Sequence, residues 1–290
     1  MQAEALVLEI ALGDYPHTRL LKSRLAGSPL FNFVNVQPIT KAFAPMARQQ
    51  TYDISDMALV TFLQAKAYGK PLVILPIAVA ARSQEISLIC LANNDTIRGP
   101  ADLVGKRVGV RAYSQTTGAW IRGILAEEFR IRPEDIHWVT FEDAHVAEYK
   151  DPPFAERAKP GSDMMAMIRA GELDAVIVGN DKPASPDLKD VYPDAEEAGR
   201  QFKRKHGFAP VNHLVVVRQS TMDTQRDAVM AFCGAVKSAW KELPESSALA
   251  LGRAEIEPSV ALALQYISAQ QMLPRALTPS EVWNGAASEL

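Results

Sequence analysis

The feature that most constrains this chain is a regular alternation between short apolar runs and segments with helical periodicity, which starts near the N-terminus and continues past residue 210. Leu6–Leu12 has the pattern of a buried strand, Gly13 breaks it, and Thr18–Leu25 has the pattern of a helix. Strands that alternate with helices in this way are typical of a mostly parallel sheet flanked by helices. The sequence therefore predicts an α/β fold.

Composition indicates a folded, water-soluble protein. Of the 290 residues, 48% are apolar and 22% are charged, close to the average for globular proteins. The formal charge of −3 comes without a basic stripe of the kind that binds phosphate backbones. The longest nearly uncharged run, Leu72–Ala81, is shorter than the ~20 residues of a membrane-spanning helix, so it predicts a buried strand instead. We therefore expect neither a nucleic-acid partner nor membrane insertion.

The N-terminus and the cysteines bear on the compartment. Glu4 and Glu9 occur almost at once, and no basic segment followed by a long apolar core is visible, so the sequence shows no secretory signal. We expect a cytoplasmic protein, or a periplasmic one if a signal peptide has been removed. Cys90 and Cys233 both lie in apolar patterns, which predicts two buried thiols rather than a disulfide framework or a metal site.

The alternation of strands and helices falls into two groups along the chain. Residues 86–212 have a strand and helix pattern of their own, and the chain after Arg218 is mainly helical. We expect residues 1–85 and 213–290 to form one lobe and residues 86–212 to form the second, with two crossings of the chain between them. Ligands of open α/β sheets bind beyond the carboxyl ends of the strands, so a ligand cleft is expected between the lobes.

Two segments carry a resemblance to a known fold. Gly99–Arg122 contains the strand motif DLVGKRVGV, followed by a polar turn that opens a helix. Met167–Val178 contains the helix-to-strand turn GELDA. Together these segments resemble the type 2 periplasmic-binding-protein-like fold. The resemblance implies two βα lobes joined by two crossover strands.

Further motifs are similar to those of the 4,5-dihydroxyphthalate decarboxylase family. They are Gly13-Asp14-Tyr15 with Thr18, the run Trp120-Ile121-Arg122-Gly123, and the segment Pro210–His213. The arginine- and histidine-rich crossover segment of that family corresponds here to Arg82–Ile86, which keeps the arginine and lacks the histidine. The resemblance implies a cytosolic enzyme that decarboxylates an aromatic acid. No organic cofactor motif is present, so we expect a cofactor-independent reaction.

A polar turn between the strand Arg107–Val110 and the following helix is the first candidate for a binding site. Backbone N–H groups, hydroxyls and the positive end of the helix dipole meet there, a combination that binds carboxylates. Serine and threonine in such a turn also act as ordinary helix caps. The residues of this turn that we expect to bind substrate are Tyr113, Ser114, Gln115, Thr116 and Thr117.

Arg82 lies at the first expected crossing between the lobes. Its guanidinium can bind a carboxylate through two parallel hydrogen bonds. The alternative is a salt bridge with Glu85 or another acid. We also expect Arg122, inside the helix that follows the polar turn, to lie on a solvated face.

The loop Gly13–Thr18 is the corresponding candidate in the first lobe. Asp14 can accept a hydrogen bond, Tyr15 can stack or donate, and His17 can titrate near neutral pH. The alternative is an ordinary turn in which Asp14 caps a helix.

His213 lies in the expected strand Val211–Val217, at the second crossing. A lone histidine in a strand is usually a hydrogen-bonded core residue, but this one matches a histidine implied by the family resemblance. Asp53, Ser55 and Asp56 end the third strand, where they can orient a phenol or a histidine or cap a helix.

The resemblance and these residues together suggest a mechanism. Loss of CO₂ from a hydroxylated benzoate requires protonation of a ring carbon before the carboxyl group leaves. His213 or His17 would supply the general acid, and Asp14 or an acid of residues 53–56 would act as the base for the phenol. Tyr15, Ser55, Arg82 and the polar turn would bind the substrate. The histidines show no tight ligand spacing, so no metal site is expected.

A second function is compatible with the same residues. A solute-binding protein of an ABC-type transporter would capture a small anion in the same cleft without catalysis. The absence of a visible secretory signal favours the enzyme, and the absence of the crossover histidine favours the binding protein. An intracellular sensor or a biosynthetic relative on this scaffold is a third alternative, and the identity of the ligand would separate the three. We expect a small anionic ligand in the cleft, and a homo-oligomer is compatible with the sequence.

Overall fold

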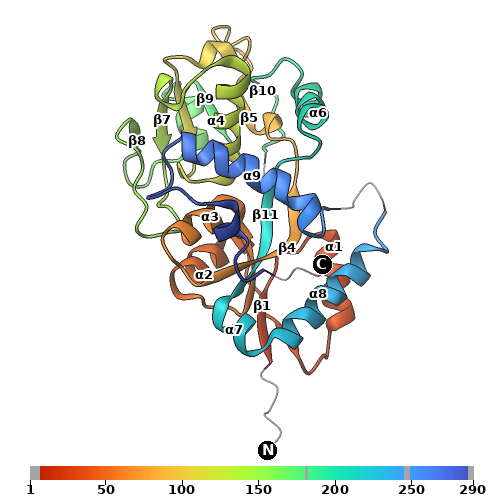
Figure 1. Ribbon diagram of the computed structural model, residues 1–290. Helices are drawn as coiled ribbons and strands as arrows, with labels where there is room; N and C mark the ends of the chain where they lie inside the picture. The colour runs from red at the N-terminus through yellow and green to blue at the C-terminus, as the bar shows by residue number, and fades with distance from the viewer. Residues whose placement is uncertain (1–6, 180–181, 245–248, 287–290) are drawn as a thin grey trace, which may run out of the picture. The chain divides into compact units, whose positions relative to one another are not determined.

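The computed structural model describes residues 7–179, 182–244 and 249–286. The chain forms two compact units, each with its own sheet (Figure 1). The first unit comprises residues 1–81, 211–261 and 275–290, and the second comprises residues 82–210 and 262–274. The predicted α/β class is confirmed in both units.

The first unit is built on a five-stranded sheet with the order β2-β1-β3-β11-β4. Strands β1, β2 and β3 are parallel, and β11 runs antiparallel to both β3 and β4. The strands are β1 (Leu8–Ala11), β2 (Phe31–Phe33), β3 (Ile54–Ala58), β4 (Leu72–Ala81) and β11 (Val211–Arg218). The helices are α1 (Pro16–Leu25), η1 (Ile39–Ala42), α2 (Phe43–Gln49), α3 (Leu59–Ala67), α7 (Gln219–Thr224), α8 (Arg226–Trp240) and α10 (Pro279–Val282).

The core of the first unit explains why the apolar run Leu72–Ala81 folds as a strand. The first eight residues of β4 are buried, so the run fits a strand that is covered on both faces, although β4 is the last strand in the order of the sheet. Leu8 and Ile10 of β1 and Phe232 of α8 belong to the same buried cluster. The expected buried strand at this position is therefore confirmed.

The second unit is built on a six-stranded sheet with the order β10-β5-β9-β6-β7-β8. Strand β6 is parallel to β7 and β9, whereas β5 is antiparallel to β9 and β10. The strands are β5 (Leu88–Leu91), β6 (Arg107–Val110), β7 (His137–Thr140), β8 (Ala155–Arg157), β9 (Ala175–Ile177) and β10 (Leu188–Asp190). The helices are η2 (Glu85–Ser87), η3 (Pro100–Leu103), α4 (Thr116–Phe129), η4 (Pro133–Asp135), α5 (Met164–Arg169) and α6 (Ala195–His206). Strand β8 lies within the polar stretch Glu142–Lys159, shortly after the adjacent Pro152 and Pro153.

Helix α9 (Arg253–Ala269) contributes residues to both units. Its last turns and the segment to residue 274 pack within the second unit, whereas we expected the whole tail to join the first lobe. Gly123 of α4 gives the reason, because a Cβ at this position would lie 1.9 Å from Cδ2 of the Tyr266 ring. The two helices approach closely only because Gly123 has no side chain. Arg82–Glu85, expected in the first lobe, also belong to the second unit.

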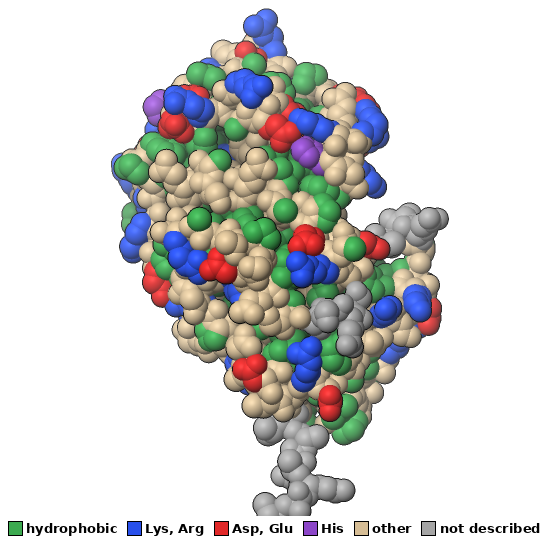
Figure 2. All heavy atoms as spheres, viewed as in Figure 1, with side chains coloured by type: hydrophobic (Ala, Val, Ile, Leu, Met, Phe, Trp, Pro, Cys, Tyr) green, Lys and Arg blue, Asp and Glu red, His purple; other side chains and the backbone are tan. Residues whose placement is uncertain are grey.

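Two predictions about composition can be compared with the structure. Cys90 and Cys233 are both free and buried, as predicted. No helix in the described ranges is both long enough and apolar enough to cross a bilayer. On the face drawn in Figure 2, basic and acidic side chains are interspersed rather than gathered by sign.

Candidate functional site

The loop between β1 and α1 positions the Tyr15 ring against the backbone. A Cβ at Gly13 would lie 2.6 Å from Cε2 of Tyr15, so glycine is required for this close approach. The Thr18 hydroxyl donates to the Gly13 carbonyl at 2.5 Å and accepts from the Tyr15 N–H at 2.9 Å. Tyr15 is the N-cap residue of α1, so its side chain leaves the helix at a fixed point.

The pairing of β3 with β11 brings Asp56 and His213 together. His213 pairs with Ala58 and Val215 pairs with Asp56 in this antiparallel ladder. Side chains two positions apart in a strand share a face, so Asp56 and His213 are diagonal neighbours on one face of the sheet. Nδ1 of His213 lies 3.3 Å from Oδ1 of Asp56.

Tyr15 completes a hydrogen-bonded cluster with these two side chains. Its hydroxyl donates to Oδ2 of Asp56 at 3.3 Å and lies 3.1 Å from Nδ1 of His213. Asp56 is fully buried, and the His213 side chain is 13% exposed. The edge of Phe43 packs against the imidazole with a centroid separation of 5.0 Å. We refer to Tyr15, Asp56 and His213 as the histidine cluster.

The histidine cluster favours one tautomer of His213. The Tyr15 hydroxyl donates to Oδ2 of Asp56, so its oxygen can accept a hydrogen bond from Nδ1 of His213. Oδ1 of Asp56, which has no hydrogen-bond partner among the described residues, lies 3.3 Å from the same nitrogen. With the imidazole proton on Nδ1, where these oxygens can accept it, the lone pair of His213 is on Nε2. Burial and the Asp56 carboxylate raise the pKa of Tyr15, which keeps its hydroxyl protonated. The arrangement suits a histidine that donates and accepts a proton at Nε2.

Two other predicted residues of the first unit have different surroundings. His17 is buried, stacks on Tyr15 at 5.3 Å and places Nε2 3.1 Å from the Val79 carbonyl. Because a carbonyl only accepts, Nε2 of His17 carries the proton, and burial lowers the pKa of this histidine. Asp14 is exposed and pairs with Nζ of Lys22 at 2.5 Å, which lowers the pKa of its carboxyl group. Neither side chain is hydrogen-bonded to the histidine cluster.

Ser55 and Asp53 do not join the histidine cluster either. Ser55 points to the opposite face of β3 from Asp56, and its hydroxyl donates to the Asp56 carbonyl at 2.8 Å. Asp53 accepts hydrogen bonds from Arg218 and from the Thr221 hydroxyl, so it connects β3 to the β11–α7 junction. Asp56 is the residue of this segment that contacts His213. From the sequence, Ser55 was expected to bind substrate, and Asp56 was only one of the acids that could orient a histidine or a phenol.

The second unit brings Arg82 to the start of α4. NH2 of Arg82 lies 3.5 Å from the Thr117 hydroxyl, and NH1 donates to the Ser87 hydroxyl at 2.6 Å. Helix α4 begins at Thr116, so Thr117 is in its first turn. A guanidinium and the positive end of a helix dipole therefore lie side by side, an arrangement that favours a carboxylate. Arg82 and Thr117 are both among the residues expected to bind substrate, and the structure places them beside each other.

The other residues of the polar turn have mixed surroundings. Ser114 and Thr116 are buried at the start of α4, and Gln115 is its N-cap residue. Oε1 of Gln115 is buried without a hydrogen-bond partner among the described residues. Tyr113 is fully buried and packs edge-on against Trp138, so it belongs to the core of the unit.

The expectation that Arg122 lies on a solvated face is wrong. This residue is 1% exposed, and its guanidinium lies 3.8 Å above the Tyr113 ring. Nε donates to Oε1 of Gln270 at 2.8 Å, and NH2 donates to the Tyr113 carbonyl at 2.6 Å. The helical period alone allowed either face, and the partner that decides it is 148 residues further along the chain.

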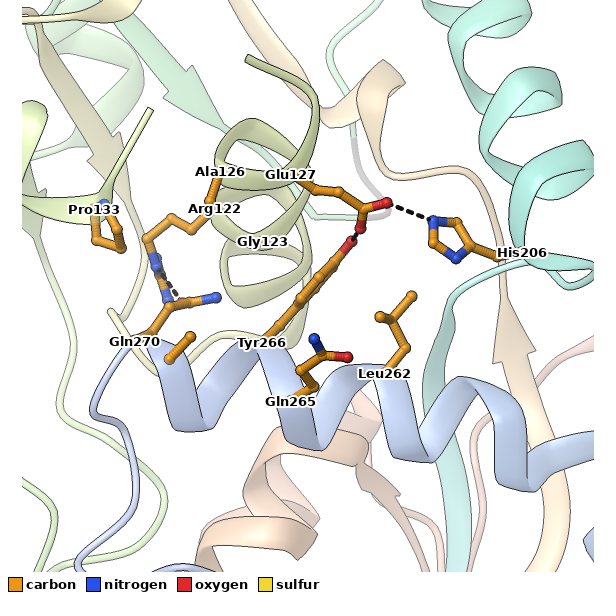
Figure 3. A pocket seen from close by; sticks show the side chains of 11 residues that line it. Arg122, Gly123, Ala126, Glu127, Pro133, His206, Leu262, Gln265, Tyr266 and Gln270 are labelled. Carbon is orange, nitrogen blue, oxygen red and sulfur yellow. Dashed lines mark hydrogen bonds and ion pairs between the residues drawn. The ribbon is translucent and has the colours of Figure 1, made fainter. Parts of the chain in front are cut away.

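A hollow of about 550 Å³ lies between α4 and the C-terminal half of α9 (Figure 3). Its polar wall is made by Glu127, which accepts from the Tyr266 hydroxyl and pairs with Lys205 and with His206. Arg122 and Gln270 lie at the other end (Figure 3). None of the residues predicted for the site lines this hollow.

Solved structures identify the architecture. The alkanesulfonate-binding protein SsuA from Xanthomonas axonopodis pv. citri matches 98% of this chain and 99% of its own, with a TM-score of 0.58 and 14% identity. The desulfurization enzyme DSZB matches 98% of this chain and 96% of its own, with a TM-score of 0.59 and 14% identity. The protein therefore has the type 2 periplasmic-binding-protein-like fold, as predicted.

Curated proteins of similar sequence are decarboxylases by name. A 4,5-dihydroxyphthalate decarboxylase from Comamonas testosteroni is 27% identical over 307 aligned residues, covering 98% of this chain and 88% of that protein. A 4,5-dihydroxyphthalate decarboxylase from Pseudomonas putida is 29% identical over 219 residues, covering 70% of this chain and 83% of that protein. The predicted resemblance to this family is confirmed. No family model matches the chain.

Proposed function

We propose that this chain is a decarboxylase acting on a hydroxylated aromatic carboxylic acid of the 4,5-dihydroxyphthalate type. The observation that carries the proposal is the histidine cluster, in which a buried carboxylate and a tyrosine orient one imidazole. Its support from sequence is the similarity to two proteins named for this activity. The fold alone does not distinguish an enzyme from a binding protein, because an alkanesulfonate-binding protein has a similar fold.

His213 is the general acid in this proposal. With Nδ1 held by Asp56 and Tyr15, Nε2 is the atom that exchanges a proton with the substrate. The imidazolium at Nε2 gives its proton to the ring carbon that bears the carboxylate. The bond between that carbon and the carboxylate then breaks, its electron pair restores the aromatic ring, and CO₂ leaves. The neutral imidazole takes up a proton before the next cycle.

Electron release from a ring hydroxyl assists the protonation. Asp14 is the acid assigned to this task, because it lies in the loop that follows strand β1, next to Tyr15 in the sequence, and its carboxylate is exposed. A carboxylate that accepts a hydrogen bond from the substrate phenol increases the electron density of the ring. Asp56, being fully buried, acts through His213 rather than on the substrate.

The start of α4 would hold the carboxylate of the substrate. Arg82 supplies the positive charge, Thr117 supplies a hydroxyl beside it, and the first turn of the helix adds its dipole. Charge-assisted hydrogen bonds from a guanidinium are among the stronger polar interactions available to a protein. A ligand with two neighbouring acidic groups, such as a phthalate, fits this donor set better than a neutral phenol.

The test is a thermal-shift screen followed by detection of CO₂. The purified chain is mixed with 4,5-dihydroxyphthalate, hydroxybenzoates, phthalates and sulfonates, and a bound ligand raises the melting temperature whether or not it reacts. We expect the hydroxylated phthalates to raise it and to release CO₂. Release from none of the acids that bind would contradict the decarboxylase proposal.

The second candidate is a solute-binding protein for a small anion. The likeness of fold to an alkanesulfonate-binding protein favours it, because that protein is named for binding alone. Binding of phthalates or sulfonates without gas release, and with an unchanged ligand after incubation, would support it.

A further inference from the structure

Arg122 has surroundings that are unusual for a cation in a protein core. It is 1% exposed, and its hydrogen-bond acceptors are neutral: the Gln270 amide, the Tyr113 carbonyl and the sulfur of Met272. Within the described ranges no carboxylate forms an ion pair with it. A buried cation is costly unless its charge is compensated or used.

The guanidinium of Arg122 lies directly behind the polar turn. NH2 donates to the carbonyl of Tyr113, the residue that leads into the turn, and the central carbon of the guanidinium lies 3.8 Å from the centre of the Tyr113 ring. NH1 is buried and has no hydrogen-bond partner in the described part of the chain. A Cβ at Gly118 would lie 3.2 Å from NH1, so the guanidinium rests against the first turn of α4.

Gln270 holds Arg122 in this position from the other side. Its Oε1 accepts from Nε of Arg122 (Figure 3). Its Nε2 donates to the carbonyl of Ala119 at 2.8 Å. The amide is 6% exposed and therefore fixed by these two bonds. The guanidinium of Arg122 thus connects three parts of the second unit: helix α4, the polar turn and the C-terminal segment that contains Gln270.

We propose that Arg122 is a positioning residue for carboxylate binding: it fixes the Tyr113 carbonyl and adds a buried positive charge behind the first turn of α4. The proposal rests on the assignment of that turn as the carboxylate site. Asp151 is the carboxylate whose charge acts on Arg122. It forms no ion pair with the guanidinium, so the positive charge of Arg122 is only partly compensated. Low polarity around the guanidinium strengthens its effect on a bound anion.

The test compares Arg122→Lys and Arg122→Gln with the control Arg130→Gln, which removes an exposed guanidinium at the end of the same helix. Amide hydrogen exchange of residues 113–118 reports the order of the turn without any ligand. Calorimetry with phthalate and benzoate reports carboxylate affinity, and CO₂ release from 4,5-dihydroxyphthalate reports KM and kcat separately.

For Arg122→Lys we expect faster exchange in residues 113–118 and about a tenfold rise in KM, with kcat changed little, because the misplaced turn weakens ground-state binding. Arg122→Gln, which also removes the charge, should weaken phthalate further, and Arg130→Gln should match the wild type. Where the Arg122 variants do not fold, Gln270→Ala and Gly118→Ala test the same contacts, and both should weaken carboxylate binding.

Two results separate this inference from the proposed function. Folded Arg122 or Gln270 variants with wild-type exchange in the turn and wild-type carboxylate affinity would overturn the positioning role. A wild-type protein that releases no CO₂ would overturn the decarboxylase alone, since exchange and phthalate affinity would still test Arg122. A wild-type protein that binds no carboxylate would overturn both.

Discussion

The hydroxyl of Tyr15 lies 3.1 Å from Nδ1 of His213, although the two residues are 198 positions apart in the chain. Both also contact the carboxylate of Asp56, which is fully buried. The side chains of Tyr15, Asp56 and His213 therefore contact one another, although they come from the loop before α1, from β3 and from β11. A buried carboxylate is costly unless polar groups are paired with it, and Tyr15 and His213 are the side chains beside Asp56.

Replacement of His213 tests the proton-transfer role directly. His213→Gln keeps a polar side chain of similar length but removes the titratable nitrogen, so we expect CO₂ release to fall by roughly 10²–10⁴-fold, the usual contribution of a general acid. Carboxylate affinity, measured by calorimetry, should change little. His137→Gln, at an exposed position of the second unit, is the control and should keep full turnover. Unchanged turnover in His213→Gln would remove the histidine from the mechanism.

Gly13→Ala tests whether the position of Tyr15 matters. The added methyl would lie 2.6 Å from the Tyr15 ring, which is held by Asp56 and by stacking on His17, so the ring must move. We expect a loss of about 1–3 kcal/mol in the free energy of unfolding, as for other overpacked sites, together with reduced turnover. Gly27→Ala is not a suitable control because of its positive φ, whereas Gly234→Ala meets no atom within 4 Å. A Gly13→Ala protein with wild-type stability and turnover would contradict the strict need for glycine.

The sequence predicts the class of the fold because apolar periodicity reports local structure directly. The run Leu72–Ala81 is a strand and the polar turn opens a helix at Thr116, as expected from residues adjacent in sequence. Assignment of the last segment to a unit depended instead on long-range contacts, among them that between Gly123 and the Tyr266 ring and that between Arg122 and Gln270. Nothing in the periodicity of either helix specifies which partner it meets.

The candidate site residues could be predicted from the sequence where they directly follow a strand or begin a helix. Arg82 and Thr117 were both expected at the carboxylate site and lie 3.5 Å apart. The choice between Ser55 and Asp56 needed the register of β3 against β11, because neighbouring residues of a strand point to opposite faces. Asp56 lies on the same face of β3 as Ala58, which is paired with His213. The sequence pattern alone does not give this pairing, so it could not show that Asp56 rather than Ser55 faces the histidine.

The carboxylate site is tested by removing its hydroxyls and its charge. Thr116→Ala with Thr117→Ala, and separately Arg82→Gln, should each weaken binding of phthalate by about 10–100-fold, the range for hydrogen bonds to a charged group. Thr224→Ala, an exposed threonine in α7, is the matched control. Calorimetry at low and high salt should show that the loss in Arg82→Gln shrinks as salt rises, because the charge contribution is screened. Intact phthalate affinity in both variants would place the anion elsewhere.

The pH dependence of stability should reveal His17. Burial lowers its pKa, so the folded state binds fewer protons at this residue than the unfolded chain, whose histidine titrates near 6.5. The free energy of unfolding should therefore be unaffected well above pH 6.5 and fall progressively as the pH drops through and below that value. Urea titrations between pH 5 and 8 measure this slope for the wild type, His17→Gln and the exposed control His137→Gln. We expect His17→Gln to be less stable at pH 8, because it loses the stacking on Tyr15 and the bond to Val79, but to have a flatter profile below pH 6.5. Parallel profiles for the wild type and His17→Gln would show that the titration belongs to another group.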